Sequence, residues 1–173
     1  MIIGGPHLLA HTGPHSLAHF QFALNSDSFG LFQGREAEEK WPTYYVFRMF
    51  GDHMRGNRIS TKVISPGFVW NWEIKDKQGQ PRVVPYVTVT GCVNGDQLNL
   101  MVVNKHPDSK IDLIPQFHNL AKTVMGINVS ILTGDYPEAT VPKIHAQQLQ
   151  PDKDLIITLP AHSLSAIRIK FSQ

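Results

Sequence analysis

The stretch VVPYVTVTGCVNGDQLNLMVVN, residues 83–104, decides the fold of this chain. Its first half is rich in β-branched residues, which favour strands. Asn94-Gly95 follows, a dipeptide typical of the tight turn of a β-hairpin. Leu98–Asn104 is an almost continuous apolar run, which predicts a strand buried on both faces. We therefore expect an antiparallel hairpin whose returning strand lies in the middle of a sheet.

Short strands separated by turns continue on both sides of this hairpin. Ser163 to Lys170 alternates between polar and apolar residues, which predicts a strand with one buried face. Strands recur about every ten residues with no helical pattern between them. The predicted fold class is mostly β: an antiparallel β-sandwich of about eight strands with an N-terminal strand and one α-helix. The other expected strands are Thr61–Ile64, Phe68–Ile74 (a strand or an ordered loop), Ile111–Ile114, Val124–Leu132, Lys143–His145, Leu155–Leu159 and Leu164–Phe171.

The first 60 residues differ from the rest of the chain. His19–Leu24 alternates and predicts a strand. Trp41–Met54 predicts an amphipathic helix, because its apolar side chains recur on one face, and Gly56 is expected to cap its C-terminal end. We divide the chain into an N-terminal βα segment, residues 1–60, which packs on a β-sandwich domain, residues 61–173.

The composition is that of a globular protein with one domain, or one domain and a short appendage. Of 173 residues, 42% are apolar and 17% are charged, so the chain can bury a core. The net charge of +2 comes without a basic stripe, which argues against a nucleic-acid partner. No apolar run reaches the roughly 18–20 residues of a membrane helix, so we expect no membrane contact. The N-terminus predicts no signal peptide, and nothing in the sequence assigns a compartment.

Cysteine and histidine are the residue types whose spacing could indicate a metal site here. The single cysteine, Cys92, excludes an intramolecular disulfide and any CxxC site, and we interpret it as a buried structural thiol. Four histidines recur every four residues, a spacing that could place two imidazoles on one metal ion. Gly13-Pro14 interrupts the helix that this site would need, so polar surface is the preferred interpretation. We predict no metal and no cofactor; the four residues are His7, His11, His15 and His19.

Two tryptophans are the candidate carbohydrate-binding residues. Trp70 and Trp72 are two positions apart, so on a strand they share a face. Two exposed, coplanar indole rings would form a platform on which sugar rings stack. The alternative is that both side chains cover the end of the sandwich core, as large aromatic residues often do.

Taken together, residues 61–173 resemble the C-terminal β-sandwich of α-L-arabinofuranosidases and related clan-A glycoside hydrolases. The resemblance is carried by the Asn-Gly hairpin that ends in Val-Val-Asn-Lys and by the closing strand that follows Leu159-Pro160. Residues 1–60 resemble the last strand and helix of the catalytic barrel, with Pro-Thr-Tyr-Tyr opening the helix. The loop Tyr136–Pro142 departs from the family, because it lacks the usual asparagine. The matching stretches are Lys62–Pro66, Val84–Val89, Asn94–Lys105 and Ile157–Ile167.

The resemblance implies that catalysis would lie outside this chain. In those enzymes the acid/base and nucleophile glutamates lie on earlier strands of a (β/α)8 barrel, and this chain has room for one βα unit. No residue here matches either glutamate motif, and the carboxylates lie in turns or charged loops that would not tune their pKa values. His162 and Ser163 are adjacent, but neighbours on a strand point to opposite faces, so they form no triad. We predict no catalytic residue.

Three functions therefore remain open. The first is a non-catalytic accessory sandwich of a glycosidase, which stabilises a barrel and contacts polysaccharide. The second is a free-standing carbohydrate-binding module. The third is an oligomeric enzyme with its site at a subunit interface or at a histidine-bound metal. Fold alone cannot choose among them, because function depends on the site.

The N-terminal segment also predicts self-association. Without a barrel beside them, its apolar residues would form an exposed patch that monomers rarely tolerate. We therefore expect a homo-oligomer or a chain paired with another subunit. The residues are Phe20, Phe22, Leu24, Phe29, Leu31, Phe32, Tyr45, Phe47, Met49 and Phe50.

Overall fold

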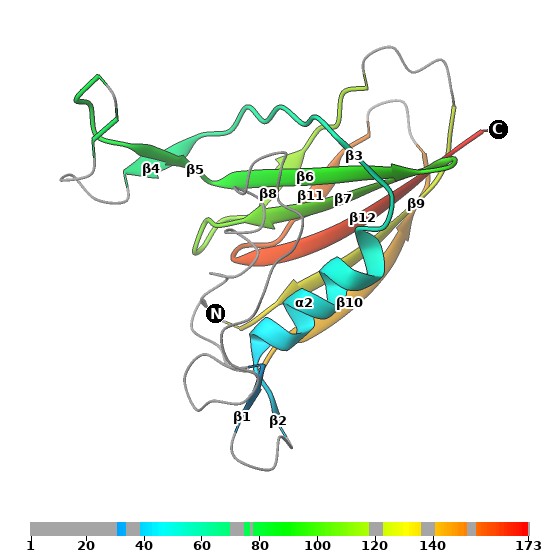
Figure 1. Ribbon diagram of the computed structural model, residues 1–173, viewed down its shortest axis with the longest axis horizontal. Coiled ribbons are helices and arrows are strands. Elements are labelled where there is room, and N and C mark those ends of the chain that lie inside the picture. The colour runs from blue at the N-terminus through cyan, green and yellow to red at the C-terminus, as the bar shows by residue number, and fades with distance from the viewer. Residues whose placement is uncertain are drawn as a thin grey trace.

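The structure is a computed structural model that describes residues 31–33, 39–69, 75–76, 78–117, 123–135, 141–151 and 155–172. In this part of the chain one helix accompanies the strands β1 to β12, and a six-stranded antiparallel sheet forms the centre (Figure 1). The mostly β, antiparallel fold class is thus confirmed. In spatial order, the six strands are β10 (Lys143–Leu149), β9 (Val124–Thr133), β12 (Ser163–Phe171), β7 (Gln97–Asn104), β6 (Val87–Asn94) and β3 (Asn57–Ile59).

Three pairs of short strands complete the description. The β4–β5 pair projects from the body of the molecule at the left of Figure 1. The β1–β2 pair lies next to the beginning of the helix, and the β8–β11 pair packs against the central sheet. Their bounds are β1 (Phe32–Gln33), β2 (Glu39–Lys40), β4 (Gly67–Val69), β5 (Val83–Pro85), β8 (Ile111–Leu113) and β11 (Ile157–Leu159).

The β6–β7 hairpin confirms the prediction made from residues 83–104. Asn94 pairs with Gln97, so Gly95 and Asp96 form the two-residue loop. Gly95 has a φ of +61°, and it is the first of the two loop residues, as in a type II′ turn. β7 lies between β12 and β6, and every residue of Leu98–Asn104 is buried, as the apolar run predicted.

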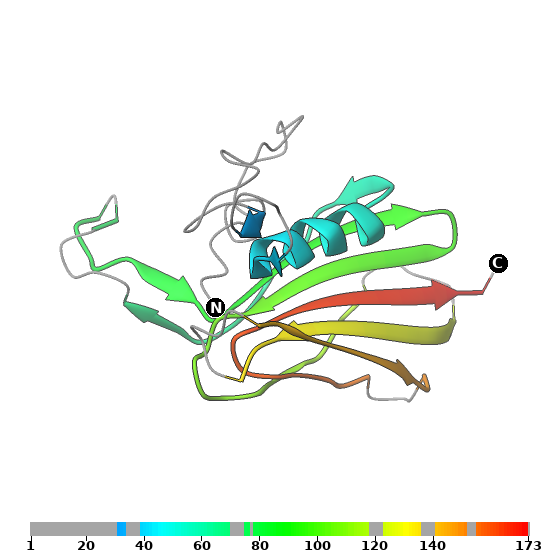
Figure 2. The same cartoon turned by 90° about the horizontal axis from the view of Figure 1, so that it is seen from below.

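The two faces of the central sheet are covered by different elements. Helix α2 (Pro42–His53) lies on one face, where Val46 and Met49 pack against Met101, Leu132 and Leu164 (Figure 2). β8 and β11 cover the opposite face, whose core is larger. Its fully buried members are Val102, Ile127, Val129, Ile157, Leu159, Ile167 and Ile169.

Helix α2 follows the predicted bounds closely. Pro42 stands in its first turn, where the missing backbone N–H costs nothing, and Met54 closes it by donating its N–H to Phe50 O. Gly56 lies beyond this cap and has a φ of +140°. A Cβ there would come within 2.3 Å of Val93 O. Glycine is therefore needed because the backbone passes close to the β6–β7 hairpin, and the predicted capping role was wrong.

Two sequence predictions about strands were wrong. Residues 61–64 form no strand; the chain pairs earlier, as β3, and Ile64 is 92% exposed. Ile59 of β3 packs where Gly91 has no side chain, so a contact between elements decided the pairing. β12 is not half-buried, because α2 and the larger core cover both of its faces and its serines lie inside.

Two further strand predictions concern residues that the structure does not describe. His19–Leu24 and residues 70–74 of the expected strand Phe68–Ile74 lie outside the described residues. Within the part that the structure describes, no helix is long and apolar enough to cross a membrane.

Candidate functional site

Six residues singled out from sequence as binding candidates lie outside the described part of the chain. This holds for the proposed sugar platform, Trp70 and Trp72, and for His7, His11, His15 and His19. Their roles stay predictions. Cys92 lies in the described part of the chain, where it is a buried free thiol, as expected. Burial raises the pKa of its thiol, and a hydrogen bond with Asn99 opposes that shift.

Carboxylates in the described ranges form no acid/base pair. Asp52 pairs with Arg48 on the helix surface, and Asp76 Oδ1 accepts backbone hydrogen bonds from Gln78 and Gln80 in a turn. Every described carboxylate except that of Asp96 is exposed, whereas catalytic carboxylates lie in clefts that tune their pKa values. No group of three or more His, Cys, Asp or Glu side chains able to hold a metal ion occurs among these residues.

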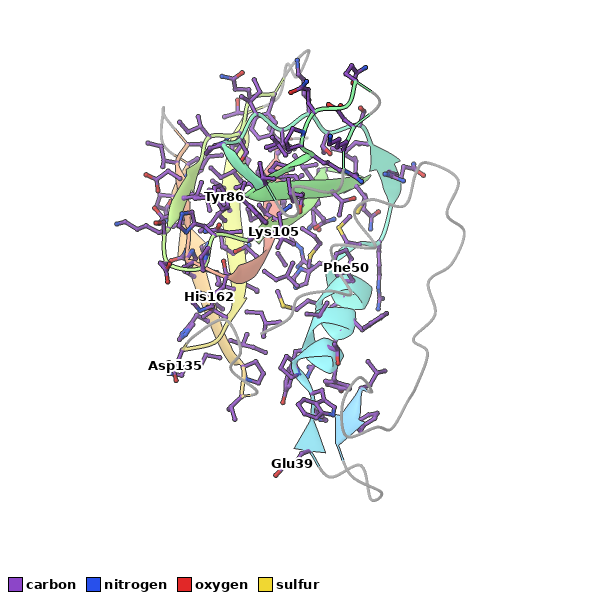
Figure 3. All side chains as sticks on the ribbon, turned by 90° about the vertical axis from the view of Figure 1, so that its left-hand side faces the viewer. Glu39, Phe50, Tyr86, Lys105, Asp135 and His162 are labelled. Carbon is purple, nitrogen blue, oxygen red and sulfur yellow. The ribbon has the colours of Figure 1, made fainter. Side chains whose placement is uncertain are left out.

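One end of the central sheet brings together three aromatic rings, a half-buried lysine and a histidine. Tyr86 comes just before β6, and the hairpin register places it beside Lys105, which follows β7. Lys105 N donates to Tyr86 O at 2.8 Å. Figure 3 labels both residues, with His162 below them and Glu39 far from all three, in β2. We call this group the Tyr86 cluster; its members are Phe68, Tyr86, Lys105, His106 and His162.

The three aromatic rings of the Tyr86 cluster stack on one another. The Tyr86 ring lies 5.2 Å from that of Phe68 and 4.5 Å from that of His106, centroid to centroid, with interplanar angles of 34° and 35°. The Tyr86 ring therefore packs against a neighbouring ring on each side. A flat platform for a sugar needs a free ring face, and the Tyr86 ring lies between two other rings.

Lys105 is the basic group of the cluster. Burial lowers the pKa of its ammonium from 10.5 to about 8, because the charged form loses hydration. Sequence reasoning missed this residue, since its partial burial depends on the loops that meet at the end of the sheet.

His162 joins two loops through its ring. Nδ1 lies 2.7 Å from Pro107 O, and Nε2 lies 2.9 Å from Gly134 O. Both neighbours are backbone carbonyl oxygens, so a ring nitrogen that carries a proton donates it to the oxygen that it faces. The residue holds a φ of +38°, which is uncommon for a side chain with a Cβ.

The polar side chains of this region hydrogen-bond to backbone atoms of the neighbouring loops. His106 Nδ1 accepts hydrogen bonds from the backbone N–H groups of Asp108 and Ser109, and the His162 nitrogens face backbone oxygens. Ser163 Oγ donates to Pro160 O at 2.7 Å instead of facing a base. Both imidazoles and the serine hydroxyl are engaged by backbone, so none is poised for nucleophilic catalysis.

A second polar group lies where the helix ends. Arg168 Nε donates to Asn99 Oδ1 at 3.3 Å, and Arg168 Nη2 lies 3.4 Å from His53 Nδ1. The pKa of His53 is lowered, first by burial and then by the positive charge of Arg168. Arg168 and His53 thus link the last turn of α2 to the middle of β12.

Comparison with known proteins gives a likeness of fold. No protein-family model and no curated protein matches the sequence. An α-L-arabinofuranosidase from Thermotoga maritima, solved as an arabinose complex, matches with a TM-score of 0.63 at 19% identity. This chain shares a fold with part of that enzyme. The match covers 82% of this chain and 31% of the Thermotoga enzyme, which fits the resemblance to a C-terminal domain.

Other glycoside hydrolases show the same partial match. The family 51 α-L-arabinofuranosidase AbfB from Bifidobacterium longum matches with a TM-score of 0.56 at 18% identity, over 81% of this chain and 28% of that chain. A GH30 endoxylanase from Clostridium papyrosolvens matches with a TM-score of 0.54 at 12% identity, over 82% and 30%. The chain therefore spans less than a third of the length of these enzymes.

Proposed function

We propose that this chain acts as the non-catalytic accessory β-sandwich of an α-L-arabinofuranosidase-like glycoside hydrolase. The observation that carries the proposal is the asymmetry of the match, which covers 82% of this chain and 31% of the Thermotoga enzyme. The described carboxylates agree with it, because all of them except that of Asp96 are exposed. The proposed division keeps residues 1–60 as a barrel-derived segment and 61–173 as the sandwich.

Helix α2 is the element that we propose to stabilise a catalytic barrel. Its inner face is occupied by the sheet, while Tyr44, Phe47 and Gly51 recur at i, i+3 and i+7 on its outer face. Tyr44 is held by the Phe32 ring at 5.4 Å and by Lys40 Nζ at 4.7 Å from the ring centroid. Half-buried aromatic residues on one helix face suit packing against another helix.

Activity measurements on the full chain test the non-catalytic role. We expect no turnover of aryl α-L-arabinofuranosides or aryl β-xylosides by chelator-treated protein, with or without added copper or zinc. Metal-independent turnover would contradict the proposal and require a carboxylate pair between subunits. Metal-dependent turnover would contradict it too, and would favour a histidine-bound metal site.

Binding to a barrel tests the stabilising role. A catalytic barrel of an α-L-arabinofuranosidase, supplied as a separate chain without its own sandwich, should melt at a higher temperature when this chain is added. Phe47→Gln should reduce that shift without lowering the stability of this chain, and Gln78→Ala in an exposed turn is the matched control. An unchanged melting temperature of the barrel would contradict the stabilising role.

Contact with polysaccharide is a separate part of the proposal, assigned to Trp70 and Trp72. Insoluble arabinan and xylan should retain the chain, and Trp70→Ala together with Trp72→Ala should abolish retention while the melting temperature stays unchanged. Retention without any barrel binding would instead favour a free-standing carbohydrate-binding module. Retention by the double variant would remove the two tryptophans from the site.

A further inference from the structure

The outer edge of β10 is the longest strand edge at the margin of the central sheet. β10 pairs with β9 over seven consecutive residues, from Lys143 opposite Thr133 to Leu149 opposite Ile127, without a bulge. It is the last strand of the six-stranded sheet, and no described residue pairs with its other edge (Figure 1). Lys143 to Gln148 are all exposed, and only Leu149 is half-buried.

Proteins normally protect such an edge, because its unpaired N–H and C=O groups bind further strands. The usual devices are short length, proline, charged side chains and bulges. The opposite edge of the sheet follows this rule, since β3 has three residues and carries Arg58. Residues 144–149 of β10 contain no proline and no charged Asp, Glu, Lys or Arg side chain.

Exposed apolar side chains accompany this unprotected edge. Ile144 is 52% exposed on β10, and Val141 just before it is 75% exposed. The patch predicted from the N-terminal segment is different: its described members, Leu31, Phe32, Tyr45, Phe47, Met49 and Phe50, are buried or half-buried. That part of the expectation was wrong for Tyr45, Met49 and Phe50, which pack on the central sheet, and Phe32 lies against the Tyr44 ring.

We propose that a second copy of this chain pairs with β10 in antiparallel fashion, about a two-fold axis at Ala146. Two six-stranded sheets then become one continuous sheet across the dimer. Edge-to-edge pairing satisfies the backbone groups of both strands at once, and a two-fold dimer uses the same surface twice, leaving neither edge open.

The sequence of β10 is complementary to itself in this register. Ile144 lies opposite Gln148 of the second copy, and His145 lies opposite its Gln147. Lys143, the one charged Lys, Arg, Asp or Glu of the strand, lies opposite Leu149 and is already ion-paired with Asp135. The two Ala146 residues meet at the axis, so no like charges face each other and no bulky side chain blocks the approach.

This dimer does not depend on the proposed role in a glycosidase, since it follows from the strand alone. The first test is the mass of the full chain by sedimentation or light scattering over a wide range of concentration. One strand pair makes a small interface, so we expect a concentration-dependent dimer. A monomer at every concentration would overturn the proposal.

A charge-swap pair locates the interface. Ala146→Lys and Ala146→Glu should each be monomeric, because like charges then face each other across the axis. Mixed in equal amounts, the two variants should dimerise again. Gln78→Lys, in an exposed turn far from β10, is the control and should dimerise like the unaltered chain. Dimerisation of both single variants would overturn the assignment to β10.

A cross-link gives an independent readout. Opposed residues of antiparallel strands have Cα atoms about 4.5–5.5 Å apart, within the span of a disulfide. Ala146→Cys should therefore form an intermolecular disulfide on mild oxidation. Cys92 is buried and should not compete. Failure of Ala146→Cys to cross-link under conditions where the chain dimerises would place the interface elsewhere.

Discussion

At the scale of single residues, Asn104 joins three parts of the chain. It is fully buried at the end of β7. Its Nδ2 lies 3.0 Å from Ser109 O and 2.8 Å from Pro160 O, and its Oδ1 accepts a hydrogen bond from His106 N at 3.0 Å. These partners fix the orientation of the amide, because carbonyl oxygens require the nitrogen and the backbone N–H requires the oxygen.

We expect Asn104→Asp to destabilise the fold by about 3 kcal/mol or more, since a buried carboxylate would face carbonyl oxygens and lose both amide donors. Urea unfolding measures the change. Asn94→Asp, exposed at the hairpin, is the control and should change the free energy of unfolding little. Equal stability of the two variants would show that the Asn104 contacts contribute nothing.

His53 makes the fold sensitive to acid. Its pKa is lowered from 6.5 in the fold by burial and by Arg168, so the unfolded chain takes up this proton at a higher pH than the folded chain. The free energy of unfolding should therefore fall as the pH drops below 6.5. His53→Gln should flatten the pH dependence in this window, measured by urea unfolding at several pH values. His145→Gln, on exposed β10, is the control; an identical effect of both variants would exclude a specific role for His53.

At the scale of elements, helix α2 contains a glycine that no contact requires. A Cβ at Gly51 would meet nothing within 4 Å, and the residue lies exposed in the last turns of the helix. Gly51→Ala should stabilise the protein by about 0.5–1 kcal/mol, because it restricts the unfolded chain and favours the helix. Thermal unfolding measures the shift.

Gly56 provides the contrast, because its positive φ and its approach to Val93 O leave no room for a Cβ. Gly56→Ala should lower the melting temperature. A stabilising Gly56→Ala, or a destabilising Gly51→Ala, would contradict this account of the two glycines.

At the scale of the whole molecule, the central sheet depends on the N-terminal segment. Met101, Val103, Leu132 and Leu164 are buried beneath α2. A chain that begins at residue 61 would expose them and lose β3, so we expect it to aggregate or to bind a hydrophobic dye. Near-ultraviolet circular dichroism and dye fluorescence of both chains check this. Cooperative unfolding of the shortened chain, with unchanged spectra, would show that 61–173 is an independent domain.

Local signals explain which elements could be predicted. The β6–β7 hairpin and helix α2 follow from short-range turn chemistry and periodicity, and β7 follows from its continuous apolar run. β3 has only three residues, two of them polar, so it shows no alternation of polar and apolar residues that would predict a strand. The burial of both faces of β12 was missed because Ser163 and Ser165 look solvent-exposed in sequence but lie beneath other elements.

The sequence by itself determined a mostly β antiparallel fold with one helix, because turn residues and apolar spacing act over a few neighbours along the chain. Only the tertiary structure decided the Tyr86 cluster, the lowered pKa of Lys105 and the outer edge of β10, with which no described residue pairs. Each of these features depends on which segments, far apart in the sequence, lie next to one another in the fold. Desolvation, ring stacking and strand pairing are interactions through space, so they depend on the packed chain and not on residue spacing.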